Sequence, residues 1–116
     1  MLAAMKEKLS PFARRTSLRQ LRAFGAYVRA GSISGAAEAL GLTPPAVSQQ
    51  LKLLEEALGG VPLTLRDREG VRPSEAGEEV LLALDRIEAA LSDCAAAVGA
   101  LSGLERGSVA VGVVST

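Results

Sequence analysis

The residues best suited to chemistry gather in the stretch "LTPPAVSQQL", residues 42–51. Thr43 is a suitable N-cap and two prolines follow it, so we expect a helix over about Pro45 to Leu58. Within it, Gln can pair with adenine through two hydrogen bonds in a major groove, and Ser can serve several base edges. Four residues recur at steps of three, one and three and therefore share one face: Pro45, Ser48, Gln49 and Lys52. This short, polar face with one cation is suited to entering the major groove of DNA.

Two further helices are expected before this one, and they would position it. The first spans about Ser17 to Ala30, because apolar residues recur there at steps of three and four. A short second helix follows "AGSIS"; Ser32 or Ser34 can cap it, and Gly41 suits the left-handed position that ends it. A helix, a short glycine-containing turn and a helix form the helix-turn-helix pattern. The third helix then turns four apolar residues to the core: Val47, Leu51, Leu54 and Leu58.

Charge is unevenly distributed along a chain whose net charge is zero. Residues 14–72 hold nine basic and five acidic residues, whereas residues 73–116 hold two basic and seven acidic residues. Such asymmetry is typical of a chain whose basic part binds nucleic acid. Arginines also line one side of the first helix, where a solvated face and a phosphate contact explain them equally well: Arg15, Arg19, Arg22 and Arg29.

A two-stranded hairpin is expected in "GGVPLTLRDREGVRPSEAG", residues 59–77. Val61, Leu63 and Leu65 alternate with other residues before a charged tip with Gly70, which is typical of paired strands. Three arginines lie on or near the tip: Arg66, Arg68 and Arg72. They indicate a basic wing that contacts the flanking DNA backbone or minor groove, and the alternative is an ordinary solvated turn.

The clearest periodicity predicts a long helix from Ser74 to about Ser102. Seven residues step by four and three for three heptads, which is the pattern of a coiled-coil seam: Val80, Leu84, Ile87, Leu91, Cys94, Val98 and Leu101. A domain this small cannot cover such a seam, so we expect a homodimer through this helix. The alternative is that the seam packs back on the winged domain. At this position the cysteine is expected to be a small buried apolar residue.

Composition limits the classes of protein to which the chain can belong. Its 116 residues, 48% of them apolar, suffice for one domain and an appended element. There is no apolar run long enough to span a membrane, and the N-terminus lacks the apolar core of a secretion signal. One cysteine and no histidine exclude a disulfide framework within the chain and disfavour a zinc site. These features favour the cytoplasm, with no membrane partner.

Two stretches resemble the N-terminal domain of the LysR-type bacterial transcriptional regulators: "SLRQLRAFGAYVRAGSISGAAEALGLTPPAVSQQLKLLEEALG" (17–59) and "GVRPSEAG" (70–77). The resemblance covers about Ser17 to Leu104 and implies a mainly α fold, in which a winged helix-turn-helix of three helices and a two-stranded wing precedes a long dimerising linker helix. The expected segments are a flexible N-terminal extension (1–16), the winged domain (17–73), the linker helix (74–103), and a hinge with the first strand of an absent effector-binding domain (104–116). "TPPAVS" and "VGVVST" also resemble the regulators of carbon-fixation (Calvin-cycle) operons.

The resemblance also implies partners and contacts. The family binds an interrupted palindrome in double-stranded DNA, its linker helices pair antiparallel, full-length members form tetramers, and a small-molecule effector binds the C-terminal domain. Base contacts would fall on Pro44, Pro45, Ser48 and Gln49, and the wing arginine on Arg66. Thr43 and Lys52 would contact phosphates. The chain departs from the family at Pro44, where many members have Gln, at Thr64, where Phe is usual, and in "LGGVPL", which is one residue longer.

Two hypotheses of function remain after the sequence is considered as a whole. The first is a dimeric, sequence-specific DNA-binding regulator of transcription. The second is a coiled-coil protein-interaction module whose basic half contacts an acidic protein. An enzyme is disfavoured, because the chain has no histidine, nucleophile–base pair, phosphate-binding glycine loop or metal cluster, and we expect no cofactor. Glu55 and Glu56 are adjacent, so they point about 100° apart on a helix, and we expect surface charges there, with Glu55 paired to an arginine.

Overall fold

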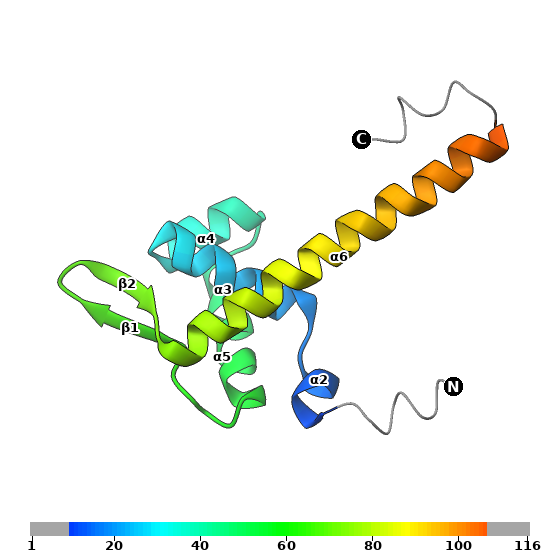
Figure 1. Ribbon diagram of the computed structural model, residues 1–116. Coiled ribbons are helices and arrows are strands. Elements are labelled where there is room, and N and C mark those ends of the chain that lie inside the picture. Colours follow the sequence, from blue (N-terminus) through cyan, green and yellow to red (C-terminus); the bar gives the residue numbers. More distant parts are fainter. Residues whose placement is uncertain (1–9, 107–116) are drawn as a thin grey trace. The chain divides into compact units, whose positions relative to one another are not determined.

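The computed structural model describes residues 10–106, with side chains through residue 103, and places five helices and one hairpin in that range. Their order is α2 (Pro11–Arg15), α3 (Leu18–Ala30), α4 (Ile33–Leu40), α5 (Pro44–Ala57), β1 (Thr64–Asp67), β2 (Gly70–Pro73) and α6 (Glu75–Arg106) (Figure 1). The chain divides into two units, Met1–Leu84 and Asp85–Thr116, so the boundary lies inside α6. The predicted architecture, a three-helix domain with a two-stranded wing followed by a long helix, is confirmed.

Local capping explains where the helices begin and end. The hydroxyl oxygens of Ser17, Ser32 and Thr43 each accept a hydrogen bond from the N–H three residues on, at 3.3, 3.0 and 3.3 Å. Gly41 ends α4 with a left-handed φ of 68°, which only glycine adopts without steric cost. The third helix begins at Pro44, one residue before the predicted start. Proline is tolerated in the first turn because backbone N–H groups there have no acceptor within the helix, so the N–H groups missing from Pro44 and Pro45 cost no hydrogen bond.

Helix α3 supplies side chains to both apolar clusters of the first unit. It packs against α4 and α5, which also contact each other, and β2 lies against it (Figure 1). The first cluster joins α3 to α5, the base of the wing and the first turns of α6 through six buried residues: Leu21, Phe24, Leu54, Leu63, Val80 and Leu84. The second cluster joins α3 to α4 and α5: Ala26, Tyr27, Ala36, Ala37 and Val47.

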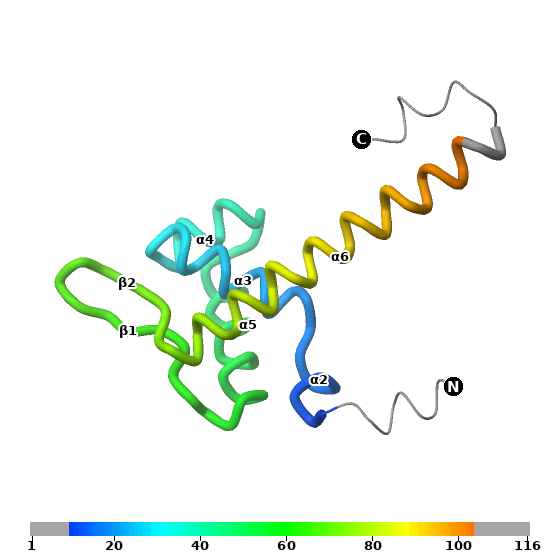
Figure 2. Tube along the Cα trace, in the orientation of Figure 1, coloured from blue at the N-terminus to red at the C-terminus, as the bar shows by residue number. Residues whose placement is uncertain are grey.

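The wing is shorter than the sequence pattern suggested. Its strands pair antiparallel from Thr64 opposite Pro73 to Asp67 opposite Gly70. The alternation through Val61 and Leu63 was therefore wrongly assigned to a strand, since both residues lie between the end of α5 and the start of β1. Figure 2 shows this connection as a loop. The physical reason is that Pro62 has no N–H to donate, and the Leu63 N–H donates to the Glu55 carboxylate at 3.4 Å.

The start of α6 is fastened to that loop. The Ser74 hydroxyl caps α6 by accepting from the Gly77 N–H at 3.0 Å, and it donates to the Pro62 carbonyl at 2.8 Å. The Ser74 N–H donates to the Leu63 carbonyl at 2.9 Å. A Cβ on Gly77 would overlap the Leu63 carbonyl oxygen and crowd Phe24. The helix can lie this close only because residue 77 has no side chain.

The structure corrects the predicted seam at its first two positions. Val80 and Leu84 are only 8% and 7% exposed, because they are buried in the first cluster of their own chain. They are therefore core residues and not a surface for a second copy, and the first unit extends to Leu84. The remaining five seam residues are exposed: Ile87, Leu91, Cys94, Val98 and Leu101. Cys94 is exposed in the single chain, so its predicted burial depends on a partner that covers the seam.

The N-terminal segment also differs from expectation. Residues 11–15 form α2, capped by the Ser10 hydroxyl, and Phe12 packs against the first cluster, so this part of the predicted flexible extension is ordered on the domain. The expected strand at the C-terminal end lies outside the described residues. None of the helices between residues 10 and 106 has the length and apolarity needed to cross a membrane.

We expect Gly77→Ala to lower the free energy of unfolding by about 3 kcal/mol, because the methyl group would overlap a backbone carbonyl that cannot move independently. The measurement is urea denaturation followed by circular dichroism. Glu79→Ala, at an exposed position of the same helix, is the control and should change stability by less than about 0.5 kcal/mol. Equal stability of the two variants would contradict the close approach.

Candidate nucleic-acid interface

Helix α5 has one buried and one exposed side. Val47 and Leu54 are 0% exposed and Leu51 is half-buried, so these residues fasten the helix to the clusters beneath it. The predicted polar face is exposed along its whole length: Pro45, Ser48, Gln49 and Lys52. Pro44 is exposed as well. The structure therefore brings together on one exposed face the α5 residues that the sequence predicted. The opposite side of the helix is packed against the core.

The polar groups of this face are available to a ligand. The side chains of Ser48, Gln49 and Lys52 make no hydrogen bond or ion pair with residues 10–106, so their donors and acceptors face solvent. The Thr43 hydroxyl accepts from the Ala46 N–H at 3.3 Å, and its own proton stays available for a phosphate oxygen. The first turn of α5 contains no acidic residue, so the positive end of the helix dipole is not neutralised and favours an anion.

A basic hollow borders the turn that precedes α5. Exposed Arg19 and Arg22 from α3, with Leu40 and Leu42 at the end of α4, line an open hollow of about 260 Å³. Leu42 directly precedes the Thr43 cap, so the hollow borders the turn that leads into α5. A phosphate contact by Arg19 stays a prediction.

Strand register separates the three wing arginines. Residues opposite each other in an antiparallel pair share a face, so Arg66 and Val71 point to one side of the hairpin, and Leu65 and Arg72 to the other. Arg66 Nη2 donates to the Tyr27 hydroxyl at 3.3 Å. Arg68 lies in the turn and makes no hydrogen bond or ion pair within the described residues.

Arg72 differs from Arg66 and Arg68 because it forms an ion pair with an acidic residue. Its Nε lies 3.0 Å from Asp67 Oδ2, and Asp67 Oδ1 accepts from the Glu69 N–H at 2.9 Å. The Glu69 N–H and the Arg72 guanidinium hold the pKa of Asp67 below its ordinary value. The Asp67 carboxylate therefore stays ionised at neutral pH, and of the three wing arginines only Arg72 has an acidic partner within residues 10–103.

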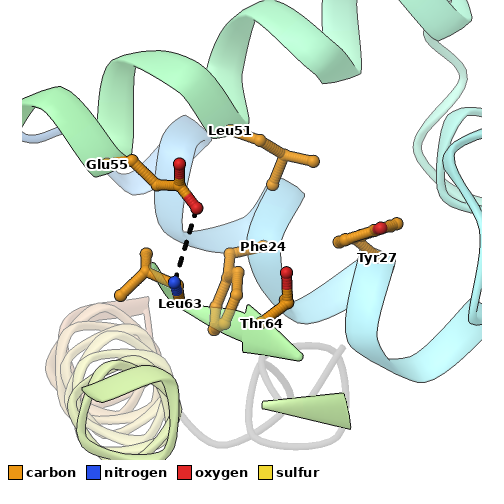
Figure 3. A pocket seen from close by; sticks show the side chains of 6 residues that line it. All are labelled: Phe24, Tyr27, Leu51, Glu55, Leu63 and Thr64. Carbon is orange, nitrogen blue, oxygen red and sulfur yellow. Dashed lines mark hydrogen bonds between the residues drawn. The ribbon is translucent and has the colours of Figure 1, made fainter. Parts of the chain in front are cut away.

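A small cavity lies where α3, α5 and β1 meet, as Figure 3 shows. Its volume is about 30 Å³, enough for one water molecule. Its lining comprises Phe24, Tyr27, Leu51, Glu55, Leu63 and Thr64 (Figure 3). Glu55 is half-buried here, and its bond to the Leu63 N–H ties α5 to the loop that precedes β1. The expectation that Glu55 is a surface charge paired with an arginine is wrong.

Three residues important for this surface were missed in the sequence: Tyr27, Glu55 and Asp67. Tyr27 had a usable signal, because it lies three residues after Phe24 and so shares the buried side of α3, where a phenol needs a hydrogen-bond partner. Asp67 lies five residues before Arg72, but only the strand register shows that they meet. Nothing in the sequence singles out the Glu55 contact with the Leu63 backbone.

Comparison with known proteins identifies the family. The pattern of the bacterial regulatory helix-turn-helix proteins of the LysR family matches residues 18–78, slightly more than half of the chain. The chain belongs to the LysR family. This match covers α3, α4, α5, both strands of the wing and the first turn of α6. The resemblance found in the sequence is therefore confirmed.

Individual LysR-family relatives agree with this assignment. The HTH-type transcriptional regulator CbbR of Xanthobacter flavus is 50% identical over 100 residues, 86% of this chain and 30% of the relative. The RuBisCO operon transcriptional regulator of Allochromatium vinosum is 42% identical over 102 residues, 86% of this chain and 33% of the relative. The chain thus spans about a third of these relatives. A crystal structure of the CbnR DNA-binding domain with DNA superimposes with a TM-score of 0.66 at 30% identity, over 75% of this chain and 99% of that one.

We expect Gln49→Ala to weaken binding to a preferred duplex by about 1–3 kcal/mol and to relax discrimination at one base pair, because the amide can form two hydrogen bonds to one base edge. The preferred duplex is first selected from a randomised pool, and affinities are then measured for it and for its single-base-pair variants. Gln50→Ala, about 100° around the same helix, is the matched control and should leave discrimination unchanged. An equal loss on every duplex would show that Gln49 contacts phosphate or serves the fold.

Proposed function

We propose that this chain binds DNA sequence-specifically as a dimer, and that the protein to which it belongs is a transcriptional regulator. The observation that carries the proposal is the exposed α5 face. Its polar groups have no partner among residues 10–106, its first turn lacks acidic residues, and its helix belongs to a LysR-family helix-turn-helix. Such a face has the size and the chemistry to enter a major groove.

The proposed contacts follow from where the side chains lie. Base edges would be contacted by Pro44, Pro45, Ser48 and Gln49. Phosphates would be contacted by Thr43 and Lys52, and the flanking DNA by Arg66 and Arg68 of the wing. We assign Arg72 a weaker contribution, because Asp67 neutralises it.

The dimer interface is proposed on the second unit. Ile87, Leu91, Val98 and Leu101 are 37%, 46%, 59% and 64% exposed and continue one seam with Cys94, so the described part of the chain leaves these apolar groups in water. A second copy of the same seam would cover them, which is the simplest partner for a heptad pattern. Two copies would also match the two halves of an interrupted palindrome.

The remaining expectations concern the whole protein. We propose that it is a bacterial cytoplasmic regulator of a carbon-fixation operon, since its relatives include regulators named CbbR and a RuBisCO operon regulator. A small-molecule effector and tetramer formation would then belong to the two thirds of the relatives that this chain does not cover. We propose no enzymatic role and no cofactor, in agreement with relatives that are named as regulators.

The test is a fluorescence-anisotropy titration of the 116-residue chain against an AT-rich interrupted palindrome and a scrambled duplex, at two salt concentrations. We expect tighter binding to the palindrome, with two chains per duplex, and a fall in affinity with salt because bound phosphates release counterions. Equal, weak binding to both duplexes would instead favour the protein-interaction module.

We expect Leu91→Asp to convert the dimer to a monomer, because it places a charge in the middle of the proposed apolar seam. Sedimentation velocity measures the change in mass. Ser92→Asp introduces the same charge at the next exposed position, off the seam, and should leave the dimer intact. An unchanged mass for Leu91→Asp would contradict the interface.

A further inference from the structure

We propose that Tyr27 is a positioning residue for DNA recognition, whose hydroxyl holds the Arg66 guanidinium and thereby orients the wing arginine toward DNA. This inference rests on the proposed function. It concerns a residue inside α3, on the side opposite to the solvent, which would not itself contact DNA.

The contact joins parts of the chain that are distant in sequence. Arg66 Nη2 donates to the Tyr27 hydroxyl at 3.3 Å, across 39 residues. Tyr27 is only 9% exposed, and its ring packs in the second cluster with Ala36, Ala37 and Val47. A phenol in such a place requires a polar partner for its hydroxyl, and Arg66 supplies it. The bond therefore links the rigid helical core to a side chain on the exposed wing.

The strand register reinforces the link. Val71 lies opposite Arg66, so the two side chains share one face of the hairpin. Val71 packs against the cluster that contains Tyr27, and β2 contacts α3. The hairpin is thus attached to α3 by an apolar contact from one strand and a hydrogen bond from the other. Two attachment points on one face fix the orientation of the wing better than either alone.

The bond leaves Arg66 able to bind. A guanidinium has five N–H donors in a planar fork, and Tyr27 accepts from one of them. The others remain available for a phosphate or a base edge. An arginine side chain without a partner loses much rotamer freedom when it binds DNA. Because the Tyr27 hydroxyl already restricts the Arg66 rotamers, less conformational entropy is lost on binding.

Tyr27 also relates the wing to the helix proposed to enter the major groove. Val47 of α5 belongs to the same cluster, so one group of side chains supports both DNA-contacting elements. Figure 3 shows Tyr27 on α3 beside Thr64 of β1, with Leu51 of α5 across the cavity. Because the ring sits among fixed neighbours, the position of its hydroxyl is fixed relative to α5.

The test is a double-mutant cycle on the 116-residue chain with Tyr27→Phe, Arg66→Ala and both together. Tyr27→Phe keeps the ring and removes only the hydroxyl, so thermal unfolding should change little. Affinity is measured by anisotropy for a selected duplex and for a scrambled one. We expect Tyr27→Phe to weaken binding to the selected duplex about three- to tenfold, and to change binding by less than about 1.5-fold when Arg66 is already Ala.

Arg68→Ala provides the matched control, because Arg68 lies in the same wing without a contact to Tyr27. The losses of binding free energy caused by Arg68→Ala and by Tyr27→Phe should add in the double variant. If Tyr27→Phe fails to fold, the hydroxyl serves the stability of the domain and the positioning role is overturned.

The outcomes distinguish this inference from the proposed function. If the unmodified chain does not prefer the selected duplex, the proposed function fails and the inference fails with it. The positioning role alone is overturned if the unmodified chain prefers that duplex but Tyr27→Phe binds it equally well. It is also overturned if Tyr27→Phe lowers the affinity as much in the Arg66→Ala background as in the unmodified chain.

Discussion

The close approach of α6 to the Leu63 carbonyl is the constraint on which the rest of the winged unit depends. It requires that residue 77 have no side chain, and it is held by the Ser74 hydroxyl and N–H on the Pro62 and Leu63 carbonyls. Through this contact the first turns of α6 reach the core and bury Val80 and Leu84 beside Phe24. The base of the wing and the start of the long helix therefore form one rigid junction.

Helix α3 transmits this rigidity to the surface proposed to bind DNA. Its first cluster anchors the wing base and α6, and its second anchors α4, α5 and, through Val71, the wing itself. The inner side of α5 is consequently fixed by Val47 and Leu54, while the polar groups of its outer side are exposed to solvent. None of the side chains of the polar face contributes to either apolar cluster. Residues on this face can therefore be substituted without disturbing the core.

Features that depend on near neighbours were predictable from the sequence, and features that depend on pairing were not. The cap at Thr43 and the turn at Gly41 involve residues within one helical turn, and both were predicted correctly. The burial of the heptad seam could not be predicted in this way, because the same spacing of four and three residues occurs in both parts of the helix. Val80 is buried in its own domain, whereas Leu91 is exposed. The unequal wing arginines and the Tyr27–Arg66 contact depend on register and on packing across 39 residues, which composition and periodicity do not contain.

The electrostatics of the wing bear on how such a protein would select its site. Asp67 neutralises Arg72, so fewer cations are available to phosphates than a count of arginines indicates. Affinity that does not depend on sequence grows with the number of phosphate contacts, so the Asp67–Arg72 pair lowers this affinity of a single copy by at most one such contact. We propose that selective binding comes from base edges at Ser48 and Gln49 and from two copies on one duplex, whose contacts add within a single complex. A zero net charge is consistent with this arrangement, since a weak sequence-independent contribution raises the ratio of specific to non-specific binding.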